Sequence, residues 1–237
     1  MRAPVVLVVE HEAACPPAHA GRWLAEVGCA VQVCRPYAGE PLPELAAYDA
    51  LLVLGGSVGA HDEAEAPWLA PLKEMFREAA TTGVPTLGIC LGHQVAAVAL
   101  GGAAAENPLG QQVGLLGQGW LPAAGDDPLF GVSALPGRGI QWNNDVVTAL
   151  PDGAVLLAAT PADEVQAVRF SPTVWGVQSH PEADVAVLES WADGDRDDHL
   201  EKGIDQAAVL AEIEAAAGEL EAAWRPVLAR FAALARR

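Results

Sequence analysis

The sequence reads VPTLGICLGHQVAAVALGG over residues 84–102, and the fold class can be inferred from this segment outward. An apolar run over residues 84–89 passes at once into a helix-type run over residues 92–100, which ends at two glycines. A short apolar run of this kind is typical of a strand that is buried on both faces. We therefore predict a buried strand that leads directly into a helix.

Gly88, Cys90 and Gly92 form a G-x-C-x-G motif at the junction of that strand and helix. The motif is the thiol version of the nucleophile elbow, in which small flanking residues allow a tight turn. Such a turn holds Cys90 at the carboxyl end of a buried strand, where open α/β sheets bind their ligands. The N-terminus of the following helix favours a thiolate. We therefore predict that Cys90 is a nucleophile rather than a buried core cysteine.

Strand and helix patterns alternate through the first hundred residues. The alternation predicts right-handed βαβ units, and hence an α/β fold with a doubly wound, mostly parallel sheet and flanking helices. The expected strands cover residues 5–9, 30–34, 48–54 and 84–89, and the expected helices cover residues 18–27, 67–81 and 92–100.

The second half of the sequence predicts a short antiparallel strand extension and a C-terminal helix. Pro226 lies inside that helix and should kink or break it. No linker divides the chain, so we predict one domain over residues 1–185, on which an acidic segment and helix over residues 186–237 pack. The expected strands cover residues 140–149, 154–159, 165–170 and 174–178.

The chain has 237 residues, is 51% apolar and carries a formal net charge of −18. Such a charge repels nucleic acids and anionic membranes, so we expect neither as a partner. Residues 182–221 contain 13 acidic and 2 basic side chains, which is typical of a solvated face or of a docking surface for a basic partner. Four cysteines without a C-x-x-C pair, no secretory signal and no membrane-length apolar run favour a cytoplasmic protein.

A thiolate nucleophile needs a base that moves protons and a group that orients the base. His180 follows a predicted strand and is followed by Pro181 and Glu182. This turn can present the imidazole and the carboxylate to one site, where Glu182 would hold the ring and stabilise its imidazolium form. His-Pro-Glu alone is more often a surface turn, but a thiol elbow earlier in the chain strengthens the catalytic interpretation. His93 follows Cys90 too closely to be its base, and we expect it to be structural.

Acyl transfer also needs hydrogen-bond donors for an oxyanion. Gly55, Gly56 and Ser57 end the strand that lies beside the elbow in a doubly wound sheet, so we predict an oxyanion hole from the N–H groups of Gly56 and Leu91. A nucleotide loop is the alternative, but the stretch lacks both the P-loop and the Rossmann glycine patterns. No Cys/His cluster has zinc spacing. We predict neither a metal nor a cofactor.

These motifs resemble those of the class I glutamine amidotransferases with a Cys-His-Glu triad, above all the stand-alone members similar to the glutaminase domain of GMP synthetase. The resemblance spans roughly residues 5–185 and implies the flavodoxin-like fold of that family. It also implies that Cys90 attacks the side-chain amide of glutamine, that ammonia leaves with a proton from His180, and that water cleaves the γ-glutamyl thioester. The matching segments are residues 53–56, 67–69, 83–94, 100–102, 150–153 and 175–182.

The resemblance further implies the residues that bind the substrate. Gln94 would help to hold its amino-acid end, with Gly55, Ser57 and Asn143 also assigned to substrate binding. The chain departs from the family at two positions. Asn143 stands where many relatives carry histidine, and Gln112 lies in a segment where relatives often carry an acid. Both changes lie where the acyl donor would be recognised.

Two enzymatic functions fit the sequence. The first is a glutaminase that supplies ammonia to a partner synthetase or ligase in trans. The second is a self-sufficient γ-glutamyl hydrolase or peptidase that acts on another γ-glutamyl amide, which the departures at Asn143 and Gln112 favour. A pseudo-enzyme would not need Cys90, His180 and Glu182 together. A redox-sensing flavodoxin-like protein would need neither Gln94 nor the His-Pro-Glu turn.

Overall fold

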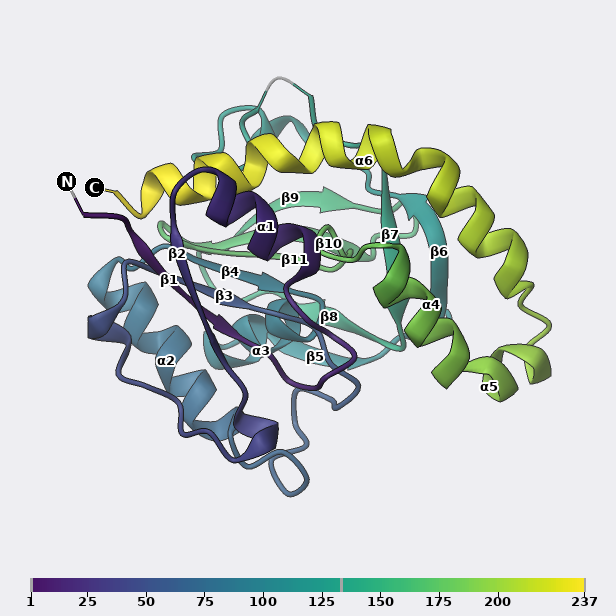
Figure 1. The fold of residues 1–237 in the computed structure, drawn as a ribbon, viewed down its shortest axis with the longest axis horizontal. Helices are drawn as coiled ribbons and strands as arrows, with labels where there is room; N and C mark the ends of the chain where they lie inside the picture. The colour runs from purple at the N-terminus through teal and green to yellow at the C-terminus, as the bar shows by residue number, and fades with distance from the viewer. Residues whose placement is uncertain (1, 133, 237) are drawn as a thin grey trace.

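The structure, a computed structural model, describes residues 2–132 and 134–236. Its centre is a seven-stranded sheet with the order β2-β1-β3-β4-β11-β10-β9 (Figure 1). The pairs from β2 to β11 are parallel, and the pairs from β11 to β9 are antiparallel. The predicted doubly wound, mostly parallel sheet is thereby confirmed. The strands are β1 (Val5–Val9), β2 (Ala30–Cys34), β3 (Ala50–Val53), β4 (Thr86–Ile89), β9 (Val155–Ala159), β10 (Val165–Ser171) and β11 (Val174–Val177).

Helices cover both faces of this sheet (Figure 1). Val6 and Val8 of β1 point to one face and pack in the core cluster that contains α1 and α6. Leu7 and Val9 point to the other face and pack in the cluster that contains α2 and α3. This alternation is the two-residue period of a strand that is buried on both sides. The helices are α1 (Ala18–Glu26), α2 (Leu69–Thr82), α3 (Leu91–Ala99), α4 (Val185–Gly194), α5 (Arg196–Glu201) and α6 (Gln206–Leu234), with short 3₁₀ helices at Pro36–Ala38, Leu45–Ala47 and Pro122–Ala124.

The expectation of one strand over residues 140–149 is wrong. The structure has two strands here, β7 (Arg138–Asn143) and β8 (Asp145–Ala149), and they belong to different two-stranded sheets. β7 pairs with β6 (Gln112–Gly117), whereas β8 pairs with β5 (Ala103–Glu106). The chain changes partner at Asn144, where the side chain of Asn143 donates to the carbonyl oxygen of Asp145. A local side-chain bond of this kind replaces the backbone partner that a continuous ladder would supply.

Pro226 does not end the last helix, because α6 continues to Leu234. Pro226 lies on the exposed side of α6, where water can satisfy the carbonyl group that its missing N–H leaves free. Trp224 and Val227 on the buried side pack into the core cluster that also holds β1 residues. The proposed boundary at residue 185 remains a prediction, and residues 1 and 237 of the two ranges lie outside the described residues. None of the described helices is long and apolar enough to span a membrane.

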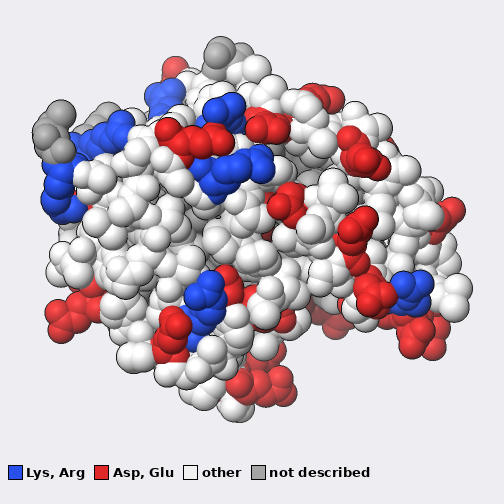
Figure 2. Space-filling view, viewed as in Figure 1, with Lys and Arg blue, Asp and Glu red and all other residues white. Residues whose placement is uncertain are grey.

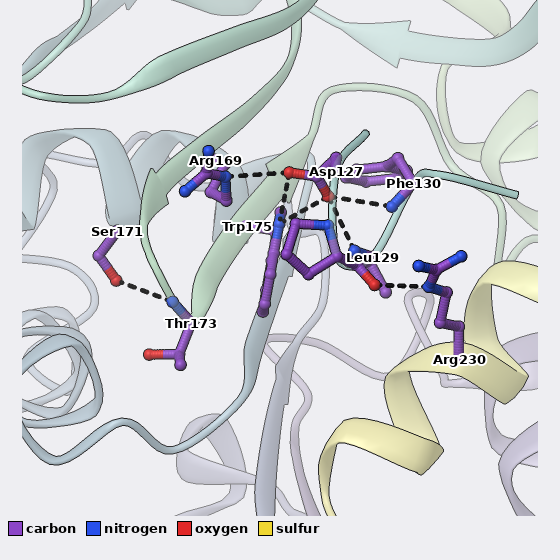
Figure 3. A network of polar contacts seen from close by, with 9 residues as sticks. Asp127, Leu129, Phe130, Arg169, Ser171, Thr173, Trp175 and Arg230 are labelled. Carbon is purple, nitrogen blue, oxygen red and sulfur yellow. Dashed lines mark hydrogen bonds and ion pairs between the residues drawn. The ribbon is translucent and has the colours of Figure 1, made fainter. Parts of the chain in front are cut away.

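Asp127 anchors the loop before β7 to the sheet and lies close to α6 (Figure 3). Its carboxylate accepts hydrogen bonds from the backbone N–H groups of Leu129 and Phe130 and from Nε1 of Trp175. Nε of Arg169 also donates to it, at 3.0 Å. From α6, Arg230 donates to the carbonyl oxygen of Pro128. Buried charges are tolerated only when they are paired and hydrogen-bonded, as this carboxylate is.

We expect Asp127→Ala to lower the free energy of unfolding by about 3 kcal/mol, because it leaves Arg169 and buried N–H donors without their acceptor. Urea denaturation of the purified variant measures the change. Asp126→Ala removes the same charge from the exposed neighbouring position and is the matched control. Equal stabilities of the two variants would show that the Asp127 contacts contribute nothing net.

Candidate active site

Cys90 lies at a strained turn between β4 and α3. Its φ is +50° and its ψ is −107°, a region that non-glycine residues rarely adopt. A Cβ atom at Gly88 would overlap the backbone of Gly92, and a Cβ atom at Gly92 would overlap the carbonyl oxygen of Val53. The two glycines of the motif are therefore required by close backbone approach. The turn places Cys90 at the carboxyl end of the sheet and at the N-terminus of α3.

The structure brings Cys90, His180 and Glu182 together. His180 follows β11, which is paired with β4, so the Cys90 and His180 residues emerge from neighbouring parallel strands. Nδ1 of His180 lies 2.8 Å from Oε1 of Glu182, and both residues are buried. A Cβ atom added at Gly55 would lie 2.8 Å from Cε1 of His180 and 3.5 Å from Cβ of Cys90. The imidazole and the thiol thus border the same small space, and their catalytic roles remain predictions.

The surroundings of His180 favour its protonated form. Burial by itself lowers the pKa of His180, but the negative charges of Cys90 and Glu182 and their hydrogen bonds outweigh burial and raise the pKa well above 6.5. With Nδ1 facing the carboxylate, Nε2 is the ring atom left for the chemistry, and no well-aligned hydrogen bond occupies it within the described ranges. An imidazolium in this position can give a proton to a leaving group.

A glutamine that the motifs did not single out also contacts the thiol. Nε2 of Gln178 lies 3.6 Å from Sγ of Cys90. Nε2 of Gln94 donates to the carbonyl oxygen of Asp145 at 2.8 Å and lies 3.4 Å from Oε1 of Gln178. Gln94 is therefore linked to the thiol through Gln178. The position of Gln178 at the end of a buried strand, two residues before His180, is the sequence feature that could have identified it.

Cys90 and His180 open into a cavity of about 670 Å³. Gly56, Ser57, Gln94 and Asn143, which the sequence predicts at the site, also line it. Ser57 donates its hydroxyl hydrogen to Glu12 at 2.7 Å and so lies at the rim. Gly55 packs against His180 rather than lining the cavity.

Gly56 and Leu91 adjoin, as the predicted oxyanion hole requires. A Cβ atom added at Gly56 would lie 3.1 Å from Cδ2 of Leu91. Leu91 is the first residue of α3, so its N–H has no acceptor within the helix. The oxyanion role of these two N–H groups remains a prediction.

Several residues that line the cavity were not predicted. They include four carboxylates and two tryptophans, and His61, to which the sequence assigned no role, lies among them. Within the described part of the chain, no group of three or more His, Cys, Asp or Glu side chains is placed to hold a metal ion. The unpredicted lining residues include Glu12, Cys15, Asp62, Trp142, Asp145, Trp191 and Asp195.

His93 is buried away from this chemistry. Its ring packs against Phe170, with a centroid separation of 5.3 Å, and against Gly176. Burial lowers the pKa of His93 to about 3, so the ring is neutral at pH 7. His180 is therefore the histidine whose position and charge suit proton transfer at Cys90.

Comparisons with known proteins cover most of the chain. A family model described as glutamine amidotransferase class-I matches residues 20–189. A glutamine amidotransferase-like protein of Salmonella typhimurium is 31% identical over 172 residues, which are 71% of this chain and 71% of that protein. The glutamine-hydrolyzing GMP synthase of Aeropyrum pernix is 34% identical over 169 residues, which are 65% of this chain but only 28% of that longer protein.

Two further comparisons concern an activity and a fold. A γ-glutamyl-L-1-hydroxyisopropylamide hydrolase of Pseudomonas sp. is 31% identical over 150 residues, which are 58% of this chain and 48% of that enzyme. The crystal structure of a glutamine amidotransferase from Thermotoga maritima superposes with a TM-score of 0.87 at 24% identity, covering 98% of this chain and 99% of that chain. This second likeness shows that the two chains share a fold.

Proposed function

The chain belongs to the class I glutamine amidotransferase family, and on that premise we propose that it hydrolyses the side-chain amide of a γ-glutamyl compound through a thioester on Cys90. One observation carries the proposal. A buried His180, oriented at 2.8 Å by Glu182, borders the strained turn that presents the Cys90 thiol. This is the arrangement of nucleophile, base and orienting carboxylate that acyl transfer requires.

The geometry supports a two-step reaction. The Cys90 thiolate attacks the amide carbon, and the N–H groups of Gly56 and Leu91 bind the oxygen that becomes negative. The C–N bond breaks as His180 gives its proton to the leaving nitrogen. Water then attacks the thioester while His180 takes one of its protons, and the C–S bond breaks to release a glutamate carboxylate. Glu182 holds the ring of His180 in the same orientation for both steps.

One acyl donor that can react in this way is glutamine, whose side chain ends in a γ amide. The leaving group would then be ammonia, which a partner synthetase or ligase would use in trans. The similarity to a glutamine-hydrolyzing GMP synthase supports this reading. Gln94, which is linked to Cys90 through Gln178, would hold the amino-acid end of the substrate.

The other acyl donor is a larger γ-glutamyl amide whose leaving group is an amine. The cavity supports this candidate, because about 670 Å³ falls within the range of about 300–1,000 Å³ that is usual for pockets of drug-sized ligands. The similarity to the Pseudomonas γ-glutamyl amide hydrolase points the same way. Of the two donors, the size of the cavity favours the larger amide.

A glutamine analogue with an electrophilic γ carbon tests the chemistry that both donors share. We expect it to label Cys90 stoichiometrically, because this thiol faces the cavity beside a proton donor, and peptide mass spectrometry locates the label. Cys90→Ala should abolish labelling, whereas Cys29→Ala, a buried cysteine outside the cavity, should not change it. Labelling at Cys15, which lines the same cavity, with Cys90 unmodified would refute the proposal.

A further inference from the structure

The wall of the cavity on the His180 side is both aromatic and acidic. Trp191 meets the His180 ring edge to face, with centroids 4.6 Å apart, and Trp142 lies 5.9 Å from Trp191. Oδ2 of Asp195 accepts a hydrogen bond of 2.7 Å from Nε1 of Trp142. Glu12 lies at the same cavity and is held by the Ser57 hydroxyl. We call Glu12, Trp142, Trp191 and Asp195 the leaving-group wall, because His180 must protonate the nitrogen that leaves.

The two acids of this wall form no ion pair with a Lys or Arg among the described residues. Neutral groups donate to them: the Cys15 thiol and the Ser57 hydroxyl to Glu12, and the Trp142 indole to Asp195. Arg196, the basic residue next to Asp195 in the chain, pairs with Asp193 instead. Neither Lys nor Arg occurs among the described residues that line the cavity.

A second group of acceptors in the cavity lies near Gln94, whose Nε2 donates to the carbonyl oxygen of Asp145. A Cβ atom added at Gly59 would lie 3.0 Å from Oδ2 of Asp62 and 3.4 Å from Oδ2 of Asp145, so these carboxylates converge. Burial and the charges of Asp62 and Glu106 raise the pKa of Asp145, although the nearby His61 ring partly lowers it. Asn143, which is 6% exposed and lines the cavity, has an Oδ1 atom without a hydrogen-bond partner in the described structure.

The two groups together hold four carboxylates, and a ligand with two positive charges would complement both groups. The glutamyl part of any substrate has one ammonium, and its expected place beside Gln94 puts it near Asp62, Asp145 and Asn143. A second positive charge in the ligand would then be the partner of Glu12 and Asp195. Trp142 and Trp191 suit the apolar stem and cationic head of an alkylammonium group, because aromatic faces attract cations and bury methylene groups.

We propose that the substrate is a γ-glutamyl amide whose amine part carries a second ammonium group, that is, a mono-γ-glutamyl diamine. The proposal rests on the proposed function, in its form with a larger amide. Hydrolysis would break the C–N bond, pass the His180 proton to the leaving nitrogen and consume one water, releasing glutamate and a free diamine. The leaving-group wall would hold the distal ammonium while Cys90 forms the thioester.

Three amides that differ only at the far end of the leaving group test the proposal. They are γ-glutamyl-1,4-diaminobutane, which is cationic, the neutral γ-glutamyl-pentylamide, and the anionic γ-glutamyl-4-aminobutyrate. We expect kcat/KM to be at least about tenfold higher for the cationic amide than for the neutral one, and lowest for the anionic one. Added salt should narrow the difference, because screening weakens the attraction.

Variants of the leaving-group wall should change the ratio of kcat/KM for the cationic amide to kcat/KM for the neutral amide. Glu12→Gln and Asp195→Asn keep a hydrogen-bond acceptor but remove the charge, and we expect each to lower the ratio of cationic to neutral kcat/KM by about three- to tenfold. Glu189→Gln removes a charge from an exposed position on α4 outside the cavity and should leave the ratio unchanged. A ratio that is insensitive to both wall variants would overturn the assignment of the wall.

The outcomes separate this proposal from the proposed function. Hydrolysis of glutamine or of all three amides without preference for the cation would overturn the diamine proposal and leave Cys90 chemistry intact. Failure of every γ-glutamyl compound to react at Cys90 would overturn the proposed function itself. If Cys90 is labelled but no amide turns over, protection of Cys90 from iodoacetamide decides. If 1,4-diaminobutane protects Cys90 and pentylamine does not, the leaving-group wall binds the cationic amine as proposed. If both amines protect Cys90 equally, the assignment of the leaving-group wall is refuted.

Discussion

Replacing Cys90 with alanine is expected to lower kcat for the best γ-glutamyl substrate by at least about 10⁴-fold. Without the thiol no thioester forms, and the remaining hydrogen-bond donors can only polarise the amide for direct attack by water. The loss should fall on kcat and kcat/KM alike, because the thiol acts in the transition state rather than in binding. Glutamate release from the purified variant measures the effect.

Cys34→Ala is the matched control for this loss. Cys34 is also a buried free cysteine, but it ends β2, which β1 and β3 separate from β4, and it does not line the cavity. Its variant should keep wild-type kcat and a folded circular dichroism spectrum, and Cys90→Ala should keep the same spectrum. Full activity of Cys90→Ala would end the thioester mechanism.

Replacing His180 with alanine is expected to cost about as much as replacing Cys90, within about tenfold, because the two groups act as a unit. The leaving nitrogen would lose its proton donor, and water would lose its base. His93→Ala is the variant to compare with His180→Ala, because the neutral, buried His93 packs against Phe170 rather than against the reacting atoms. Near-wild-type turnover of His180→Ala, with turnover lost in His93→Ala, would reverse the assignment of the base.

Glu182→Gln should cost about one to two orders of magnitude less than His180→Ala, because glutamine can still orient the ring but carries no charge. The raised pKa of His180 means that the protonated ring persists above pH 6.5, so loss of that proton should lower kcat/KM on the alkaline side. Removing the Glu182 charge lowers this pKa. The alkaline limb should therefore move to lower pH in Glu182→Gln, and an unmoved limb would exclude Glu182 as the partner that sets it.

Local patterns in the sequence determined the frame of the protein. The apolar run before Cys90 predicts the buried strand β4, and Gly88 and Gly92 predict a turn that leaves no room for a Cβ atom at either of those two positions. The His-Pro-Glu turn after β11 carries an imidazole and a carboxylate two residues apart in the sequence. In the structure, Nδ1 of His180 lies 2.8 Å from Oε1 of Glu182. Each of these features depends on neighbouring residues, on the two-residue period of strands or on turn chemistry, so each is visible without the fold.

Local sequence patterns do not predict which strands pair with one another. Residues 140–149 have the composition of one strand, yet β7 and β8 pair with different strands because the chain changes partner at Asn144. Pro226 has the signature of a helix break, yet α6 passes through it, since its buried face is held by Trp224 and Val227 in the core. In both cases tertiary packing outweighs a local preference.

The leaving-group wall was decided by the tertiary structure alone. Glu12 follows β1, Trp142 lies in β7, and Trp191 and Asp195 lie in and directly after α4. Each looks like an ordinary surface or core residue in its own segment. They meet because the parallel strands direct their carboxyl ends to one edge of the sheet. In addition, Nε1 of Trp191 donates a hydrogen bond to the carbonyl oxygen of Ala14, which is 177 residues earlier in the chain. Sequence periodicity records which face a side chain takes, whereas the charge of a cavity depends on which distant segments the sheet brings to the same edge.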